Sequence, residues 1–459
     1  MDEELVSTFG RGEWVDQTIL HPMGLVLMLI CGIAILTFHR RHVIWPIIII
    51  ACFVASAQRI VILSLDFNML RIMVLFGLTR LFLKHEYRGF ETQPLDKIIL
   101  LYVASRFIIH FIREPSAGTL IFELGNSFDA IGMYFMFRML IRSWEDVNHV
   151  VTAFLVIAIP VAGFFVVEHT TAHNVFSIFG GVPEITFIRD GRLRCQGAFA
   201  HPILAGAFWA TILPLIAARW WDKSKNQFMT LIGVLCVCWI VFASASSTPA
   251  FSAIMAIVGG FMVTQRNKMK IIRWGVFASV IGLHLIMKAP VWHLISRVSA
   301  VAGSTSYHRY MLINAAIRNI KEWWLLGIES TGHWFRNAVD LTNQYVAEGV
   351  RGGLLTLIIF ILGISIAFRS IGRIWRRVEN NKTHFAMSWA LGVSLFVHCV
   401  NFIGVSYFGQ IIIVWYMILA IITSIDLATE KAYLAEQSKS TDNQNMKKIQ
   451  GAVHKSWNV

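Results

Sequence analysis

Charged residues are scarce in this chain of 459 residues. Asp, Glu, Lys and Arg together make up 15% of it, against roughly 25% in soluble globular domains. Hydrophobic residues make up 56% and occur in long runs along nearly the whole length. This composition excludes an ordinary soluble protein and predicts an all-α fold, a polytopic helical bundle in a membrane.

Cysteine is also sparse, and its six residues show neither a disulfide framework nor the spacing of a zinc site. Five lie in apolar runs and Cys195 stands alone in a loop, so we expect no metal and no other cofactor. We do not expect a cleavable signal peptide either. The first residues are acidic, and the first apolar run begins only near Met23.

The apolar runs predict about thirteen membrane-spanning helices, within a range of about 12 to 14. They cover residues 22–38, 43–58, 69–83, 97–112, 119–140, 148–168, 198–218, 228–244, 249–264, 274–288, 351–368, 385–404 and 409–425. Residues 1–425 are therefore expected to form one transmembrane domain. Residues 426–459 are polar, and we expect them to be a disordered cytoplasmic tail.

Lysine and arginine gather in every second connection between these runs. By the positive-inside rule these connections are cytoplasmic, so we expect the N-terminus outside and the C-terminus inside. Two long loops, 169–197 and 289–350, then face outward, and the second is expected to contain interfacial helices. We attribute the net charge of +13 to helix orientation and anionic lipids rather than to nucleic-acid binding.

The outer loops contain almost no lysine, yet they hold several arginines. Arg192 and Arg194 lie just before the run that begins near Pro202, where a helix N-terminus adds positive potential. Since arginine can bind phosphate oxygens with two donors, this arrangement favours a pyrophosphate site. Interfacial anchoring of the loop is the alternative.

Residues 306–324 are expected to form a helix, with Ser306 as its N-cap. One face is apolar and the other carries Arg309 and Arg318, so an interfacial helix is the simplest interpretation. Arg309, near the start of this helix, could also hold an anion, and Arg297 precedes it in the same loop.

A polar cluster follows over residues 333–348. It contains His333, Arg336, Asp340, Asn343, Tyr345 and Glu348. A carboxylate or imidazole at the outer mouth of the bundle could take a proton from a sugar hydroxyl. A solvated loop is the alternative interpretation.

Five ionisable or amide residues lie inside predicted spans: Arg71, Arg106, Glu123, Asn126 and Asp129. Groups of this kind are costly in a membrane and face a cavity or one another. We favour a structural arginine–carboxylate pair here.

Three stretches carry a resemblance to a known family: RCQGAFAHPILAG (194–206), SYHRYMLINAAIRNIKEWWLLGI (306–328) and DLTNQYVAEGVRGGLLTL (340–357). In this order they resemble the O-antigen ligase and polymerase superfamily of bacterial membrane glycosyltransferases. The stretch SASSTPAFSA (244–253) is a weaker match, to a serine-rich segment that often has arginine where Thr248 stands. The likeness extends over residues 20–425.

The resemblance implies a GT-C-like bundle in the bacterial inner membrane. Its substrate would be an undecaprenyl-pyrophosphate-linked oligosaccharide, with membrane lipids, a chain-length regulator and export proteins as further partners. Neither a metal nor a nucleotide would be needed. The residues expected to bind the pyrophosphate are Arg192, Arg194, Arg297, Arg309 and Arg318. Asp340, with His333 second, would be the base, and the acceptor side would contain Arg336, Asn343, Tyr345 and Glu348.

One position departs from the pattern of the ligases in this superfamily, which have a histidine beside the asparagine of the last stretch. Thr342 stands there, before Asn343. This favours a polymerase that extends lipid-linked repeat units. A ligase that transfers the glycan to lipid A core is the first alternative. A lipid-linked oligosaccharide transporter, which would form no bond, is the second.

Overall fold

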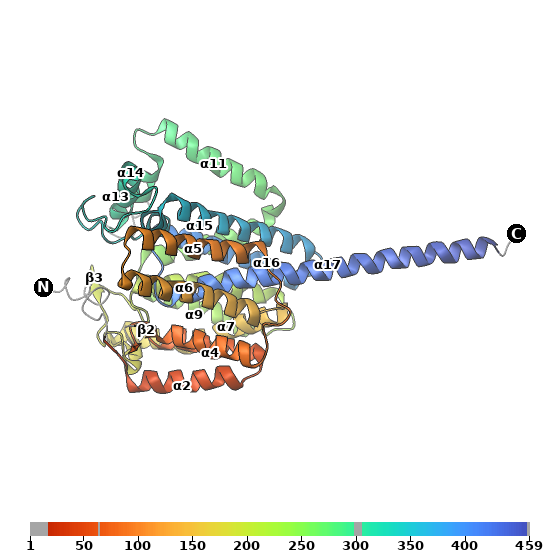
Figure 1. Cartoon of the computed structure of the whole chain (residues 1–459), viewed down its shortest axis with the longest axis horizontal. Helices are drawn as coiled ribbons and strands as arrows, with labels where there is room; N and C mark the ends of the chain where they lie inside the picture. Colours follow the sequence, from red (N-terminus) through yellow and green to blue (C-terminus); the bar gives the residue numbers. More distant parts are fainter. Residues whose placement is uncertain (1–16, 63–64, 298–304, 457–459) are drawn as a thin grey trace.

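The computed structural model describes residues 17–62, 65–297 and 305–456, and helices dominate it (Figure 1). The bundle consists of α2 (Pro22–Thr37), α3 (Ile44–Phe53), α4 (Met69–Leu83), α5 (Pro94–Arg113), α6 (Ala117–Leu140), α7 (Trp144–Thr171), α8 (Pro202–Ala218), α9 (Gln227–Ala243), α10 (Ser247–Phe261), α11 (Met269–Ile286), α15 (Gln344–Arg377), α16 (Lys382–Gly404) and α17 (Ile411–Ser456). The predicted all-α class is confirmed.

Six helices of the described chain are long and apolar enough to cross a membrane. They span Trp144–Thr171, Pro202–Trp221, Ser247–Ile286, Gln344–Arg377, Lys382–Gly404 and Ile411–Ser438. The second range joins α8 to the short 3₁₀ turn after it, and the third joins α10 to α11. Pro22–Thr37 and Gln227–Ala243 are apolar but shorter. The protein is therefore a helical membrane protein by the length and composition of its helices. The larger number of about thirteen spans remains a prediction.

Short elements connect these helices. The 3₁₀ segments are η1 (Arg40–His42), η2 (Val175–Phe179), η3 (Arg219–Trp221), η4 (Met262–Lys268) and η5 (Val291–His293). Strands β1 (Arg59–Ile62) and β2 (Leu65–Asn68) pair antiparallel, as do β3 (Ile188–Arg189) and β4 (Arg192–Leu193). Both hairpins lie at the same end of the bundle as α13 and α14 (Figure 1). We call this the outer end, following the expected orientation, and the opposite one the inner end.

The helix predicted over residues 306–324 is present as two helices, α13 (Thr305–Arg318) and α14 (Ile320–Trp323). Ser306 is not its cap, because the helix already includes Thr305. A preceding short helix, α12, spans Leu294–Arg297. We call residues 305–343 the outer segment. It has a small apolar core, in which Leu312 and Trp323 pack against Ala347 and Val350 of α15.

Helix α15 is broken once, at Gly353. Its φ of +69° is unfavourable for other residues, and a Cβ there would lie 2.4 Å from the carbonyl oxygen of Leu325. The backbone N–H of Leu354 donates to the carbonyl of Trp324 (2.8 Å), which fixes α14 against the break. The first turns of α15 are thereby joined to the outer segment and separated from the long apolar part.

The predicted disorder of residues 426–459 is wrong for the backbone up to Ser456. Helix α17 does not end near residue 425 but continues, projecting far beyond the inner end of the bundle (Figure 1). The composition explains this difference. Residues 426–456 contain no proline and a single glycine, Gly451, and many are good helix formers such as Ala, Glu, Lys and Gln. A helix already nucleated in the bundle can propagate through them.

Polar groups inside the bundle pair with one another. Arg71 on α4 contacts Asp129 on α6, with Nη2–Oδ2 at 2.6 Å and Nε–Oδ1 at 2.8 Å. Nε of Arg106 lies 3.8 Å from Oε2 of Glu123. The other oxygen of this carboxylate, Oε1, is hydrogen-bonded to Nδ1 of His110 at 2.7 Å. The Arg71–Asp129 contact confirms the expected structural arginine–carboxylate pair.

This pair makes a stability prediction. Both side chains are less than a fifth exposed, so Arg71→Met leaves the Asp129 carboxylate buried without its partner and should cost about 3–5 kcal/mol. The double variant Arg71→Met with Asp129→Leu should recover part of this loss. Glu145→Gln is the control, because its ion pair with Arg41 is mainly exposed and should contribute at most about 1 kcal/mol. Thermal unfolding in detergent measures all three. Equal losses for the single and control variants would contradict the prediction.

Candidate anion-binding site at the start of helix α10

Buried side chains hold the loop that carries Arg194. The carboxylate of Glu168, in the last turn of α7, accepts hydrogen bonds from two successive backbone N–H groups, the second being that of Gly197 (3.1 Å). Asn174 donates to the carbonyl of Gly197 (2.9 Å), and Gln410 donates to the next carbonyl (2.7 Å). Elements far apart in the sequence thus fix the backbone that leads from Arg194 into α8.

The side chain of Arg194 points to the start of α10. It is only 8% exposed, and its Nη2 donates to Oγ of Ser246 at 2.7 Å. Its buried Nε has no partner among the described residues. Burial and the nearby charge of Arg189 lower the pKa of Arg194. The guanidinium is therefore held in place while part of its hydrogen-bonding capacity stays unused.

Arg309, in the first turns of α13, also contacts the start of α10, although it lies more than 100 positions after Arg194 in the sequence. It is also 8% exposed. Its Nη2 donates to Oγ1 of Thr248 (2.8 Å), and its Nε donates to the carbonyl of Gly404 at the end of α16 (3.2 Å). Burial lowers its pKa. Both outer arginine segments thus contact the start of α10, at Ser246 and Thr248.

The start of α10 adds a third positive element. Ser246 occupies the N-cap position, yet its hydroxyl makes no capping hydrogen bond and instead donates to the carbonyl of Ser244 (3.0 Å). The free N–H groups of a helix N-terminus attract anions. In the described ranges, neither Arg194 nor Arg309 forms an ion pair with a carboxylate. Two buried cations beside a helix N-terminus favour a bound anion such as phosphate.

The other predicted pyrophosphate ligands do not join this site. Arg192 is exposed on β4. Arg318 is exposed on α13, nine residues after Arg309, and nine steps of about 100° place it on the opposite helix face. Neither side chain therefore lies with Arg194 and Arg309 at the start of α10, and a pyrophosphate-binding role for Arg192 and Arg318 stays a prediction. Arg297 ends α12, and its side chain lies outside the described part of the chain.

Asn343 lies next to Arg309 but has a structural role. Its Oδ1 accepts from the backbone N–H of Val346 (3.0 Å), which caps α15, and its Nδ2 donates to the carbonyl of Ile403 (3.1 Å). The following carbonyl, that of Gly404, accepts from Arg309. The second and third resemblance motifs therefore converge on the last turn of α16. The buried Oγ1 of Thr342 has no hydrogen-bond partner among the residues described.

The two candidate bases lie on the exposed loop between α14 and α15. The backbone carbonyl of Asp340 lies 3.4 Å from Nε2 of His308, the neighbour of Arg309 on α13. His333 instead contacts Glu322, with Nε2–Oε2 at 2.8 Å, and Trp334 donates to the same carboxylate oxygen. Asp340 is thus beside the helix that carries Arg309, whereas His333 is engaged elsewhere. Arg336 is exposed on this loop.

Tyr345 and Glu348 are placed inside the bundle, not at its outer mouth. The hydroxyl of Tyr345 donates to the carbonyl of Cys399 (3.2 Å). Glu348 is 4% exposed, accepts from Nε2 of Gln344 (2.6 Å), and interacts electrostatically with Arg106 of α5. The two side chains therefore contact α16 and α5, respectively, against which α15 packs, and their acceptor-binding role stays a prediction.

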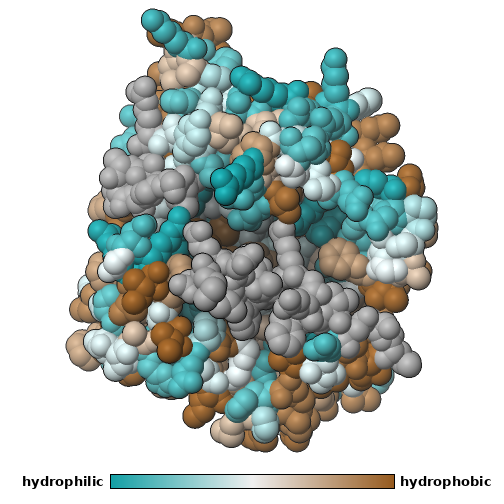
Figure 2. All heavy atoms as spheres, turned by 90° about the vertical axis from the view of Figure 1, so that its left-hand side faces the viewer, coloured by the Kyte–Doolittle hydropathy of each residue, from teal (hydrophilic) through white to brown (hydrophobic). Residues whose placement is uncertain are grey.

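Sequence reasoning missed Ser246 and Thr248 as site residues. Neither is charged, so the search for cations passed over them, although their serine-rich stretch was a weak match to the family. Their signal is a polar run directly before a span, which indicates an exposed helix N-terminus. Figure 2 shows that the outer end of the molecule mixes hydrophilic and hydrophobic side chains, with hydrophilic ones gathering in its upper half.

A pH prediction follows from His201, whose Nδ1 accepts from the backbone N–H of Ile203 (3.2 Å) at the start of α8. Burial, Arg194 and Arg189 lower its pKa to about 4, against about 6.5 in an unfolded chain. The unfolded chain then binds more protons between these values, so stability falls as pH drops from about 6.5 towards 4.

The variant His201→Asn keeps a capping acceptor but does not titrate. We expect its melting temperature to fall less than that of the wild type between pH 7.5 and pH 5. The first pH lies about one unit above the pKa of the unfolded chain, and the second lies between the unfolded and the folded pKa. Thermal unfolding in detergent at both pH values measures the difference. An identical fall for both proteins would refute the assignment.

No protein-family model matches this chain, and no curated protein matches its sequence. Its function must therefore be inferred from the geometry of the site.

Proposed function

We propose that this protein is a membrane glycosyltransferase that polymerises a polysaccharide. It would transfer a glycan from undecaprenyl-pyrophosphate to the non-reducing end of another lipid-linked repeat unit, as an exopolysaccharide or O-antigen polymerase does. The observation that carries the proposal is the convergence of Arg194 and Arg309 on the start of α10. A pyrophosphate on a lipid is an anion that a buried arginine pair at the edge of a membrane bundle can recognise.

The reaction explains why two cations are useful. The oxygen of the acceptor hydroxyl forms a bond with the anomeric carbon, while the bond from that carbon to the carrier pyrophosphate breaks. The leaving pyrophosphate keeps the electron pair and gains negative charge. Arg194 and Arg309 would stabilise this charge in the transition state, in surroundings that exclude water, and each contribution should be about 2.7–4 kcal/mol by analogy with oxyanion donors.

The acceptor proton needs a base, and Asp340 is the proposed one. It is exposed, so an acceptor can reach it, and its loop contacts α13 beside Arg309. His333 is the second candidate, although its imidazole is engaged with Glu322. Thr342 supports polymerase rather than ligase activity, because a ligase of the resembled superfamily has histidine there. The reaction would take place at the outer face of the bacterial inner membrane.

The central prediction concerns the two arginines. Arg194→Ala and Arg309→Ala should each lower the polymerisation rate by about 10²–10³-fold, because each removes a cation from the leaving group. Lys321→Ala is the control, an exposed cation of the same outer segment. The assay uses purified protein in detergent with a lipid-linked repeat unit, and measures chain length on the carrier. Full polymerisation by the double variant Arg194→Ala, Arg309→Ala would exclude the proposed site.

The identity of the product separates the related activities. A polymerase lengthens the chain on the carrier lipid, a ligase produces a glycan linked to lipid A core, and a transporter moves the intact oligosaccharide without forming a bond. Carrier-linked chain length in a deletion strain therefore tests the proposal in cells. A core-linked product with purified protein would favour the ligase alternative.

The choice of base gives a further prediction. Asp340→Asn removes the proton acceptor with little change in size, and should lower the rate by about 10²–10⁴-fold. His333→Gln should have a much smaller effect, because its ring contacts Glu322. Binding of the carrier to both variants, measured separately, should stay close to that of the wild type. A larger loss for His333→Gln than for Asp340→Asn would reverse the assignment.

A further inference from the structure

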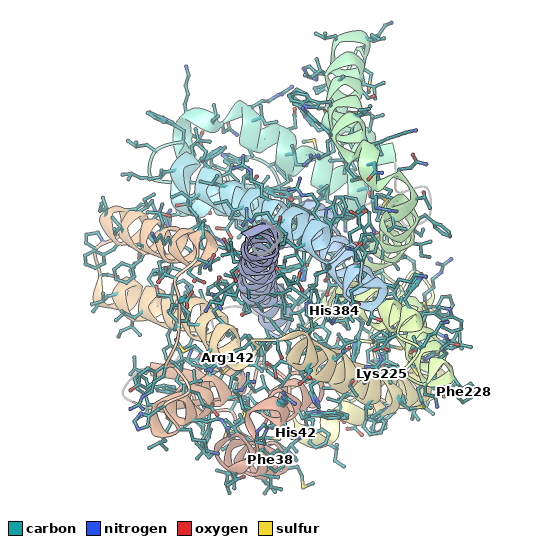
Figure 3. All side chains as sticks on the ribbon, turned by 90° about the vertical axis from the view of Figure 1, so that its right-hand side faces the viewer. Phe38, His42, Arg142, Lys225, Phe228 and His384 are labelled. Atoms are coloured by element: carbon teal, nitrogen blue, oxygen red, sulfur yellow. The ribbon has the colours of Figure 1, made fainter. Side chains whose placement is uncertain are left out.

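A charged cavity lies at the inner end of the bundle, at the end opposite Arg194 and Arg309. It has a volume of about 220 Å³. Its walls come from the connection between α4 and α5, the end of α6, the α6–α7 turn and α17. Arg142, in that turn, lies at the end of the molecule shown in Figure 3, where α17 leaves the bundle.

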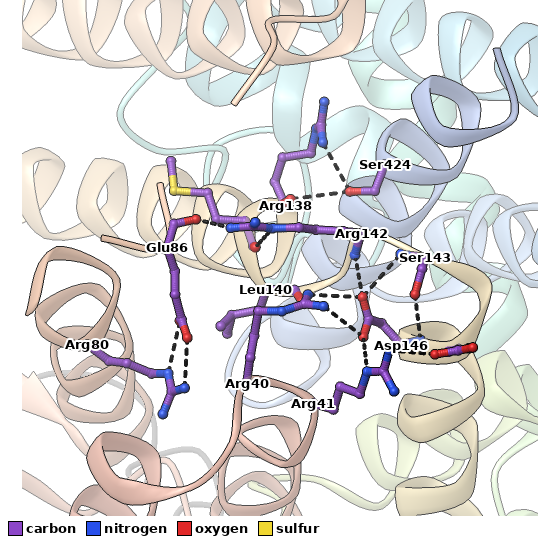
Figure 4. Close-up of polar contacts among 12 residues, drawn as sticks. Arg40, Arg41, Arg80, Glu86, Arg138, Leu140, Arg142, Ser143, Asp146 and Ser424 are labelled. Carbon is purple, nitrogen blue, oxygen red and sulfur yellow. Dashed lines mark hydrogen bonds and ion pairs between the residues drawn. The ribbon is translucent and has the colours of Figure 1, made fainter. Parts of the chain in front are cut away.

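Arg142 is the distinctive residue of this cavity. Its Nε donates to the carbonyl of Met139 (2.7 Å). Its Nη2 donates to the carbonyl of Glu86, as Figure 4 shows. These backbone acceptors orient the guanidinium without neutralising its charge. Within the described ranges, no carboxylate lies at ion-pair distance from the Arg142 guanidinium. Glu86 pairs with Arg80 and Asp146 with Arg40, and both act on Arg142 only from farther away. A positioned cation outside any ion pair is suited to an external anion.

Two more cations line the same cavity. Arg138 is buried and firmly held, with Nε 3.3 Å from Asp96 and Nη1 donating to Ser424 (3.2 Å). Lys431 of α17 contacts Glu91 at 2.5 Å, but both side chains are more than half exposed. An exposed pair of this kind contributes little stability, so the ammonium group of Lys431 can turn towards a ligand at small cost.

Glu86, Glu91 and Ser424 also line the cavity, the two carboxylates being paired with Arg80 and Lys431. The apolar and aromatic part of the lining indicates what accompanies the anion. It includes Tyr87, Phe90, Met139 and Leu427. The exposed Phe82 and Leu83 precede this region on α4, so an apolar surface continues from the cavity along the bundle. The cavity is smaller than the roughly 300–1,000 Å³ of a pocket for a drug-sized ligand. It can hold a phosphate and a short polar group, with acyl chains outside.

We propose that this cavity binds the phosphate group of an anionic phospholipid headgroup at the inner end of the protein. Arg142 and Lys431 contact the phosphate, the paired Arg138 forms part of the cavity wall, and the apolar walls contact the glycerol region. Basic cavities between membrane helices are suited to such headgroups. This inference does not depend on the proposed transferase activity, because it concerns other residues at the opposite end.

Native mass spectrometry of the purified full-length protein tests the proposal. The protein is titrated with phosphatidylglycerol and, separately, with phosphatidylcholine of the same acyl chains. The wild type should bind several-fold more of the anionic lipid. Arg142→Gln should abolish this excess and Lys431→Gln should reduce it. Lys225→Gln is the matched control, because Lys225 lies at the same end (Figure 3) but does not line the cavity.

The outcomes separate the possible anions and sites. Equal binding of the two lipids by the wild type would overturn the proposal, as would an excess that Arg309→Gln removes and Arg142→Gln leaves intact. In a separate experiment, the melting temperature is measured with inorganic phosphate in place of the lipid. If phosphate raised the melting temperature through Arg142 while phosphatidylglycerol did not, the site would bind free phosphate and the headgroup assignment would be wrong. Lys431→Gln, an exposed change, keeps the test decisive if Arg142→Gln does not fold.

Discussion

Charges inside an apolar bundle require a partner, and this constraint orders the structure. Arg71 pairs with Asp129 and Arg138 with Asp96, while Asp146 at the start of α7 contacts Arg40. The two residues of each pair are 42 or more positions apart in the sequence. Because an unpaired buried charge is costly, the pairs restrict which helices can be neighbours, in a bundle whose apolar surfaces alone would be less selective.

Arg194 and Arg309 are informative because they depart from this rule. Both are as buried as the paired arginines, yet across the residues described their partners are hydroxyl and carbonyl groups rather than carboxylates. Hydroxyl and carbonyl groups orient a guanidinium and leave its charge available. The same contrast separates Arg142 from Arg138 at the inner end, so the two proposed anion sites follow one physical criterion.

Much of the helical arrangement could be predicted, because apolar runs report directly on burial in a membrane. The predicted span 69–83 coincides with α4, and 119–140 differs from α6 by two residues at one end. The extension of α17 escaped prediction, since a polar sequence without a core does not reveal whether a preceding helix will propagate through it. Arg194 and Arg309 could be selected by residue type, whereas the separation of Arg192 and Arg318 from them depends on strand and helix faces that loop composition does not determine.

Arg309 also connects two helices, because one guanidinium contacts Thr248 at the beginning of α10 and Gly404 at the end of α16. A ligand that binds this guanidinium therefore becomes part of the packing between those helices. Binding to the folded state alone stabilises it by mass action. Under the proposed function, the carrier lipid would act as a structural component of the bundle, and its departure after each transfer would weaken the contact between α10 and α16 until the next carrier binds.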